Sequence, residues 1–116
     1  MIILLSPAKT LDYETPLPLQ SFSVSEHLKK SEELIGELRK KDPQGLSGLM
    51  GLSDKLANLN FERNMNWEPP ITPSEDSRQA IFAFKGDVYT GLSAYSLNKA
   101  DIKFLDKHVR ILSGLY

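Results

Sequence analysis

The chain opens with an uninterrupted apolar run over residues 2–5, which ends at Ser6 and Pro7. No polar residue alternates within this run, a pattern typical of a strand covered on both faces. We therefore expect a short buried strand at the N-terminus. Residues 6–20 contain three prolines, which predict an ordered loop or extended segment.

The next segment carries apolar residues at helical spacing, namely Leu28, Ile35 and Leu38. Ser23 or Ser25 is expected to cap this helix, with Glu26 as the capping-box partner of Ser23. We interpret the basic residues 39–41 as cations that neutralise a helix C-terminus rather than as a DNA-binding patch.

Two shorter helices are predicted over 44–50 and 53–63. A further helix is expected to begin at Thr72, because Pro73 suits the first helical position and Glu75 can bond back to the cap. Its apolar residues are Ala80, Ile81 and Phe84.

The last part of the chain combines helix and strand patterns. Residues 86–92 are bounded by glycine and have mixed strand and turn character, while Asn98 is expected to cap a final helix. The apolar residues of that helix are Ile102, Leu105 and Val109. Residues 109–116 are strand-like and end without a polar residue, so we expect the last strand to continue into more protein. These elements predict a mixed α/β fold, with residues 1–116 as the N-terminal part of one larger domain.

Composition narrows the function classes. The 116 residues are 41% hydrophobic and 25% charged, as in ordinary globular proteins, and the formal net charge is −1. No global basic field attracts nucleic acid or anionic lipid, so any polyanion contact must be local. Cysteine is absent, which excludes disulfides, thiolate metal sites and cysteine nucleophiles. The N-terminal apolar run is too short for a signal peptide or a membrane span, so we expect a cytoplasmic protein without a membrane partner.

No motif of an established catalytic class is present, whether a phosphate-binding loop, a nucleophile elbow or a zinc-protease helix. His27 and His108 lie far apart in the sequence and are interpreted as surface or boundary residues. The carboxylates show no metal-ligand spacing. We therefore expect neither a metal site nor a bound cofactor.

Two polar clusters nevertheless indicate a small-ligand pocket, either in an enzyme or in a binding protein. The first follows the N-terminal strand, where ligands collect in α/β folds. The second surrounds two glycines, and its lysine and tyrosine can act as bases only if their pKa values are lowered. The candidate pocket residues are Ser6, Lys9, Thr10, Lys85, Asp87 and Tyr89.

The segment 46–61 approaches a helix-hairpin-helix pattern, in which two short helices meet at a glycine-containing turn. Gly51 permits a backbone conformation closed to most residues, and the first amides of the second helix can face a phosphate. Lys55 adds a charge contact that positions DNA without reading its sequence. Against this, Ser53 caps the helix internally and Asp54 repels phosphate. The candidate phosphate-binding residues are Gly51, Leu52, Ser53 and Lys55.

Four stretches resemble the YaaA family of bacterial peroxide-stress-resistance proteins: SPAKTLD (6–12), SDKLA (53–57), RQAIFAFKGDVYTGL (78–92) and LSGLY (112–116). Members of that family are more than twice this length. The resemblance implies a cytosolic protein that keeps unincorporated iron low under peroxide stress. It also implies DNA binding through a helix-hairpin-helix, which falls on residues 46–61 here. We expect a non-enzymatic role, and an enzyme or ligand-binding protein that uses the two polar clusters is the alternative.

Overall fold

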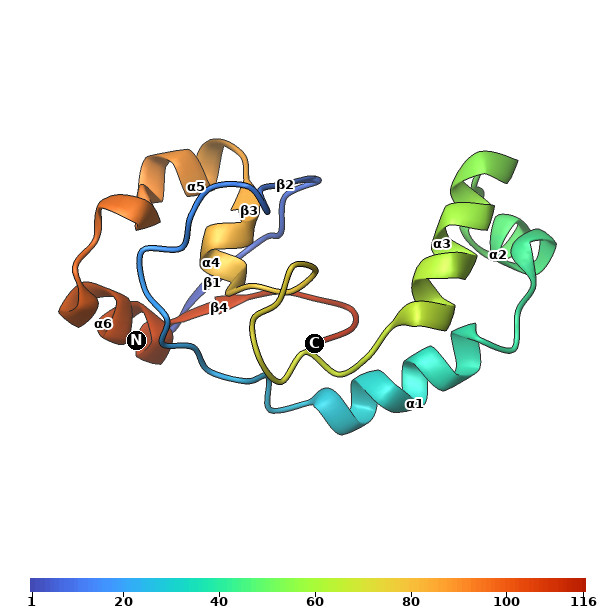
Figure 1. Cartoon of the computed structure of the whole chain (residues 1–116), viewed down its shortest axis with the longest axis horizontal. Coiled ribbons are helices and arrows are strands. Elements are labelled where there is room, and N and C mark those ends of the chain that lie inside the picture. Colours follow the sequence, from blue (N-terminus) through green and yellow to red (C-terminus); the bar gives the residue numbers. More distant parts are fainter. The chain divides into compact units, whose positions relative to one another are not determined.

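Strands β1 (Ile3–Leu5) and β4 (Val109–Ile111) pair in parallel and place residues from distant parts of the sequence side by side (Figure 1). The computed structural model describes residues 1–116. Helix α6 (Lys99–His108) runs directly into β4. The predicted Asn98 cap is confirmed, because its side chain accepts from the first amides of α6 in a complete capping box.

The N-terminal strand is confirmed, but its predicted burial on both faces is wrong. Ile3 is 40% exposed and Leu4 is 61% exposed, while Leu5 is half-buried. The sheet has only two strands, so the second edge of β1 has no strand partner. Much of its apolar surface therefore meets solvent.

The chain forms a second small sheet, also of two strands. Strand β2 (Thr10–Leu11) pairs antiparallel with β3 (Phe84–Lys85), which comes directly after helix α4 (Ala80–Ala83). The amide of Asp12 donates to the carbonyl of Ala83 over 2.7 Å and extends the ladder by one bond. The segments following β1 and α4 are therefore held together.

Two sequence predictions in this region are wrong. The helix expected from Thr72 does not form, because the backbone groups of Ser74 and Ser77 bond to each other in a tight turn and only α4 is helical. The side chains of Arg78 and Gln79 donate to backbone carbonyls of residues 13–21. Residues 86–92 are not a mixed strand and turn, since Asp87–Leu92 forms helix α5. This run is too short for periodicity to separate a helix from a turn.

The core next to the β2–β3 sheet centres on Phe82 of α4. Phe82 is 1% exposed and packs against the ring of Tyr95 at 5.1 Å between centroids. The 3-10 helix η1 (Ala94–Ser96) carries Tyr95. The hydroxyl of Tyr95 donates to the Phe82 carbonyl over 2.8 Å, so Tyr95 both satisfies its polar group and covers the buried Phe82 ring. The remaining buried residues here are Ala83, Tyr89 and Ala94.

The middle of the chain forms three helices: α1 (Leu28–Leu38), α2 (Pro43–Met50) and α3 (Asp54–Asn66). All three are confirmed, but α1 begins after His27 without a side-chain cap, so the predicted serine cap is wrong. The Ser25 hydroxyl instead accepts from the His27 amide in a local turn. The buried residues of these helices are Ser31, Ile35, Leu46 and Ala57.

Arg39 connects the end of α1 to the end of α3. Its guanidinium donates to the carbonyls of Asn64 at 2.8 Å, Met65 at 3.3 Å and Trp67 at 2.6 Å. These carbonyls lie at a helix C-terminus, where a cation is favourable. The prediction that the basic run neutralises the end of α1 is wrong, because the last turn of α1 has no basic residue. Arg39 instead bonds the carbonyls at the end of α3.

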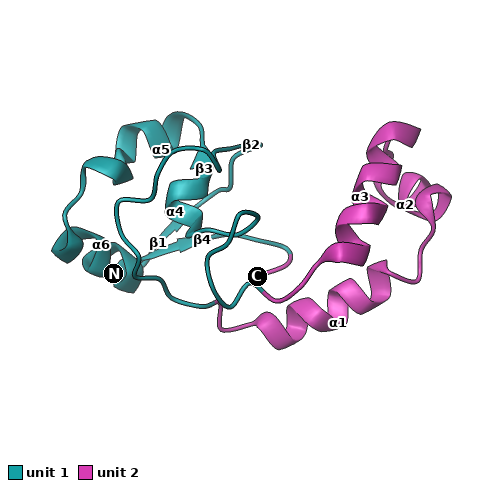
Figure 2. Ribbon diagram, viewed as in Figure 1, with its two compact units in different colours: residues 1–24, 70–114 teal, residues 25–69, 115–116 magenta.

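The chain divides into two compact units, coloured separately in Figure 2. Unit 1 consists of residues 1–24 and 70–114, and unit 2 of residues 25–69 and 115–116. Short strands and helices in one chain confirm the predicted α/β class. None of the helices combines the length and apolarity that a membrane crossing requires.

Candidate functional site

The turn between α2 and α3 is tightly bonded within itself. Gly51 has φ 64° and ψ 38°, the left-handed conformation in which an L-residue is strained. The amides of Gly51 and Leu52 donate to the Ser47 carbonyl, and the Ser47 hydroxyl donates to the Leu52 carbonyl over 2.7 Å. The predicted glycine conformation is confirmed, and the two turn amides already have acceptors.

The start of α3 keeps free donors. The Ser53 hydroxyl accepts from the Leu56 amide at 3.4 Å, which confirms its capping role. The amides of Asp54 and Lys55 belong to the first turn, where no intrahelical acceptor exists. Both of these side chains are exposed, and neither makes an ion pair. A hollow of about 340 Å³ between α2 and α3 is lined in part by Asp54.

Ala57 packs where α2 and α3 meet. It is 1% exposed, and Leu46 on α2 is fully buried. A small side chain at this position lets the two helices approach closely, as the hairpin pattern requires. The predicted helix pair is therefore present with its glycine turn and its small contact residue.

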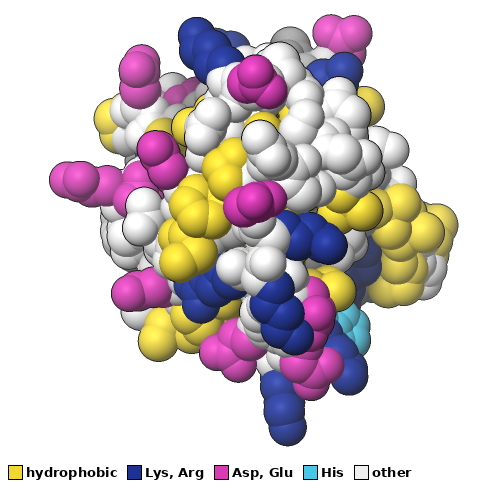
Figure 3. All heavy atoms as spheres, turned by 90° about the vertical axis from the view of Figure 1, so that its right-hand side faces the viewer, with side chains coloured by type: hydrophobic (Ala, Val, Ile, Leu, Met, Phe, Trp, Pro, Cys, Tyr) yellow, Lys and Arg dark blue, Asp and Glu magenta, His cyan; other side chains and the backbone are white.

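The charges of unit 2 are mixed. Residues 25–69 contain seven Lys or Arg and eight Asp or Glu. Figure 3 shows cationic and acidic side chains intermixed on one face, with apolar groups between them. Lys40 pairs with Glu37 at 2.6 Å, and Arg39 is engaged by carbonyls. Lys55 is therefore the cation placed at the start of α3 without an acidic partner.

The structure brings the two predicted pocket clusters together in unit 1. Thr10 lies opposite Lys85 in the β2–β3 ladder. The Tyr89 hydroxyl donates to the Ser6 carbonyl over 2.7 Å. A β-carbon on Gly86 would lie 3.3 Å from that of Ala8, so the two segments approach closely at this glycine.

A hollow of about 270 Å³ opens beside β3 and α5, and only two of the predicted pocket residues, Lys85 and Tyr89, line it. The other four predicted pocket residues do not line this hollow, namely Ser6, Lys9, Thr10 and Asp87. Sequence reasoning missed four other polar residues of its lining, namely Asp12, Thr90, Ser93 and Tyr95. Thr90 stands inside the second cluster, and Asp12 lies two residues after the first, so their positions in the sequence were the available signal.

Two ionisable groups of this hollow have shifted pKa values. Hydrogen bonds from the Thr15 hydroxyl and amide lower the pKa of Asp12 to about 2, so its carboxylate is charged at neutral pH. Burial raises the pKa of Tyr89 above its ordinary value. Tyr89 therefore stays protonated at neutral pH and donates to Ser6, which disfavours the role of a base considered for it.

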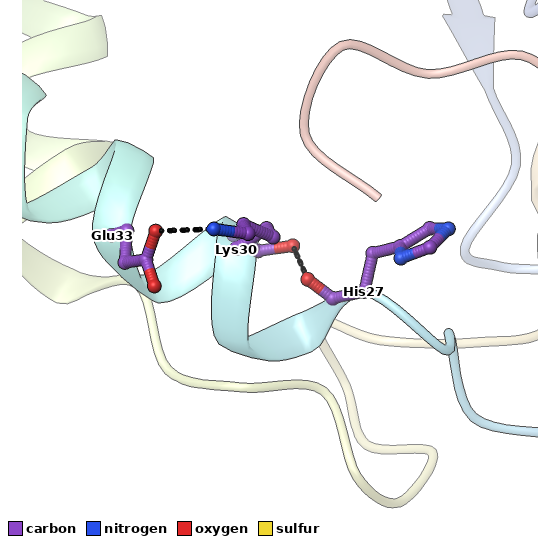
Figure 4. Close-up of polar contacts among 4 residues, drawn as sticks. His27, Lys30 and Glu33 are labelled. Atoms are coloured by element: carbon purple, nitrogen blue, oxygen red, sulfur yellow. Dashed lines mark hydrogen bonds and ion pairs between the residues drawn. The ribbon is translucent and has the colours of Figure 1, made fainter.

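Neither histidine joins a metal-binding group. Figure 4 shows the His27 ring turned away from Lys30 and Glu33, which pair with each other at 3.1 Å. His108 packs on Phe104 at 4.2 Å between ring centroids, and its Nδ1 lies 2.9 Å from the Met1 carbonyl. No set of three or more His, Asp or Glu side chains is arranged to hold a metal ion.

The sequence model of a family described as peroxide stress protein YaaA matches residues 1–116, which is the whole chain. The match includes both the α2–α3 turn and the hollow beside β3 and α5.

Proposed function

Because this chain belongs to the peroxide stress protein YaaA family, we propose that it acts in the cytoplasm to limit free iron under peroxide stress and binds DNA through the α2–α3 turn. The family match over all residues carries the stress-protection part of this proposal. The geometry of the helix pair supports the DNA-binding part. The proposed contacts are to backbone phosphates and do not depend on base sequence.

The start of α3 supplies the phosphate contacts in this proposal. Its first amides carry the positive end of the helix dipole, and Lys55 adds a full charge in the same turn. Gly51 and Leu52 hold the turn in shape, since their amides are bonded to Ser47. The Ser53 hydroxyl caps the helix, and in this proposal the Ser53 backbone faces the phosphate.

Asp54 sets the strength of this contact. Its carboxylate stands beside Lys55 in the first turn and opposes a phosphate there. One lysine and a few amides neutralise few phosphates, so we expect weak binding with a shallow salt dependence. Removing the Asp54 charge should therefore strengthen binding.

The DNA contact is tested by measuring the affinity of the protein for a random-sequence duplex by fluorescence anisotropy at several salt concentrations. Lys55→Glu should weaken binding by about tenfold, because it removes one phosphate contact and introduces repulsion. The slope of log affinity against log salt should fall by about one unit. Asp54→Asn should shift the affinity in the opposite direction.

Lys29→Glu is the matched control. It makes the same change in net charge on the first turn of α1, which lies at the end of unit 2 opposite the α2–α3 turn (Figure 1). We expect it to change DNA affinity far less than Lys55→Glu. Equal losses of affinity for the two variants would show that binding depends only on net charge, and would overturn the assigned site.

A further inference from the structure

The hollow beside β3 and α5 lies in unit 1 and takes no part in the DNA contact proposed for unit 2. Its walls are mainly rings and aliphatic groups, with a few polar groups among them, which is the usual composition of a small-ligand site. Its volume of about 270 Å³ is just below the usual range of roughly 300–1,000 Å³, so its ligand must be small.

The rings of this hollow are held with their polar ends already satisfied. The Tyr89 hydroxyl donates to the Ser6 carbonyl, and the Tyr95 hydroxyl donates to the Phe82 carbonyl. Phe84 lies against the Tyr89 ring at 5.3 Å between centroids. These hydroxyls therefore have backbone acceptors, and the rings are left to contact an apolar group.

The hollow carries one negative and one positive side chain that are not paired with each other. Lys85 makes no ion pair. Asp12 Oδ1 accepts from two amides, whereas Oδ2 accepts only from the Thr15 hydroxyl and keeps a free lone pair. Asp12 follows β2 and bonds Ala83, and Lys85 lies opposite Thr10, so the two are diagonal neighbours about 7 Å apart on the ladder.

Two hydroxyl-bearing residues complete the polar lining. Thr90 lies on α5, and Ser93 ends that helix with φ 50° and ψ 48°. Ser93 is the one residue other than glycine with positive φ, a strained conformation that is concentrated at ligand sites. Hydroxyls can donate and accept, so they suit a ligand with both kinds of group.

We propose that this hollow binds a small zwitterion with an apolar body, the chemical class of a free aromatic α-amino acid. The ligand's ammonium group bonds Asp12, its carboxylate bonds Lys85, and its ring lies against the aromatic wall. One acid and one base close together beside an apolar surface match the two charged groups that an α-amino acid carries on one carbon. They match this class better than they match a plain anion, for which Asp12 would be repulsive.

The test is isothermal titration of the whole chain with L-phenylalanine as the probe. Two analogues serve as further arms: phenethylamine lacks the carboxylate, and 3-phenylpropanoate lacks the ammonium group. We expect L-phenylalanine to bind at least about tenfold more tightly than either analogue, since each lost charged hydrogen bond is worth roughly that factor. Equal binding of either analogue would overturn the two-ended recognition.

Lys85→Met keeps an unbranched side chain of similar length and removes its charge. It should weaken L-phenylalanine binding by about tenfold and leave phenethylamine binding unchanged. Lys103→Met, on the exposed surface of α6, is the matched control and should alter neither. Lys85 is exposed, so this variant should fold, and circular dichroism checks that it does. Failure of L-phenylalanine to bind the folded wild-type chain at saturating concentrations would overturn the proposal.

Discussion

At the scale of single residues, the hydrogen bonds around Asp12 set the charge of its side chain. Its carboxylate accepts from the Glu14 and Thr15 amides and from the Thr15 hydroxyl, at 3.0, 2.9 and 2.6 Å. Those bonds, led by the Thr15 hydroxyl, lower the pKa of Asp12 from 3.8 to about 2. Asp12 also ends the β2–β3 ladder and lines the hollow. The turn that lowers its pKa therefore also fixes a charged group of a candidate ligand site.

We predict that Asp12 contributes to the pH dependence of stability in acid. A carboxyl whose folded pKa is lowered stabilises the fold above its unfolded pKa of 3.8, and this contribution is lost as the pH falls through about 2. The free energy of unfolding should therefore decrease between these pH values. The decrease should be smaller in Asp12→Asn, as measured by urea unfolding at each pH.

Thr15→Val provides the matched test of the cause. It removes the hydroxyl that bonds Oδ2 and leaves the Thr15 amide in place, so the pKa of Asp12 should rise toward 3.8. The side-chain carboxyl carbon of Asp12 reports this pKa in a nuclear magnetic resonance pH titration. A wild-type pKa near 3.8 would contradict the assignment.

At the scale of elements, the α2–α3 turn shows how one residue type serves two purposes. Gly51 ends α2 in the left-handed conformation, whereas Gly48 lies inside α2. A β-carbon added at either position would meet no atom within 4 Å. Any effect of alanine at these positions therefore comes from the backbone and not from a clash.

Alanine substitutions at these two glycines should have opposite effects. Gly51→Ala should lower the free energy of unfolding by about 1–2 kcal/mol, because an L-residue is strained in this conformation. Gly48→Ala should raise it by about 0.5–1 kcal/mol, because alanine loses less entropy in a helix. Urea unfolding at constant m value measures both changes. Changes of the same sign would show that the turn geometry is wrong.

At the scale of the whole molecule, two compact units separate the two candidate sites. The helix pair proposed to contact DNA belongs to unit 2, and the hollow proposed to bind a zwitterion belongs to unit 1 (Figure 2). The family match covers both. Variants can therefore be chosen that affect one site through residues that do not contribute to the other.

The stress-protection role predicts a cellular result. Bacteria that lack this protein should accumulate more unincorporated iron during exposure to hydrogen peroxide, as measured by electron paramagnetic resonance of whole cells treated with a chelator. Expression of the wild-type chain, or of Gly48→Ala as a matched stable variant, should restore the lower level. Unchanged iron in the deletion strain would contradict the role proposed here.

Several features of the fold were predictable from short stretches of sequence. The caps at Ser53 and Asn98 and the left-handed turn at Gly51 are all confirmed. Each depends on a residue and partners within a few positions along the chain, so the local sequence contains the interaction that forms it. The Gly51 turn and the Ser53 cap of the predicted hairpin are of this kind. The contact of the hairpin with DNA stays a prediction.

Other features depend on partners far along the chain. Residues 72–79 carry a good helix start, yet Ser74 and Ser77 close a turn there instead. The side chains of Arg78 and Gln79 hold this segment to carbonyls about sixty residues away. The apolar N-terminal strand is exposed because it has one partner strand. Local propensity is weak enough that a few such long-range bonds override it.

The sequence by itself determined the helix caps at Ser53 and Asn98, the glycine turn, the two polar clusters and the α/β class, because these depend on neighbouring residues and on hydrophobic periodicity. Only the tertiary structure decided that the two clusters meet, through the pairing of Thr10 with Lys85, and that Asp12 joins Lys85 in one hollow. Strand register over more than seventy residues of intervening chain has no local signal, since it is set by the packing of the whole unit.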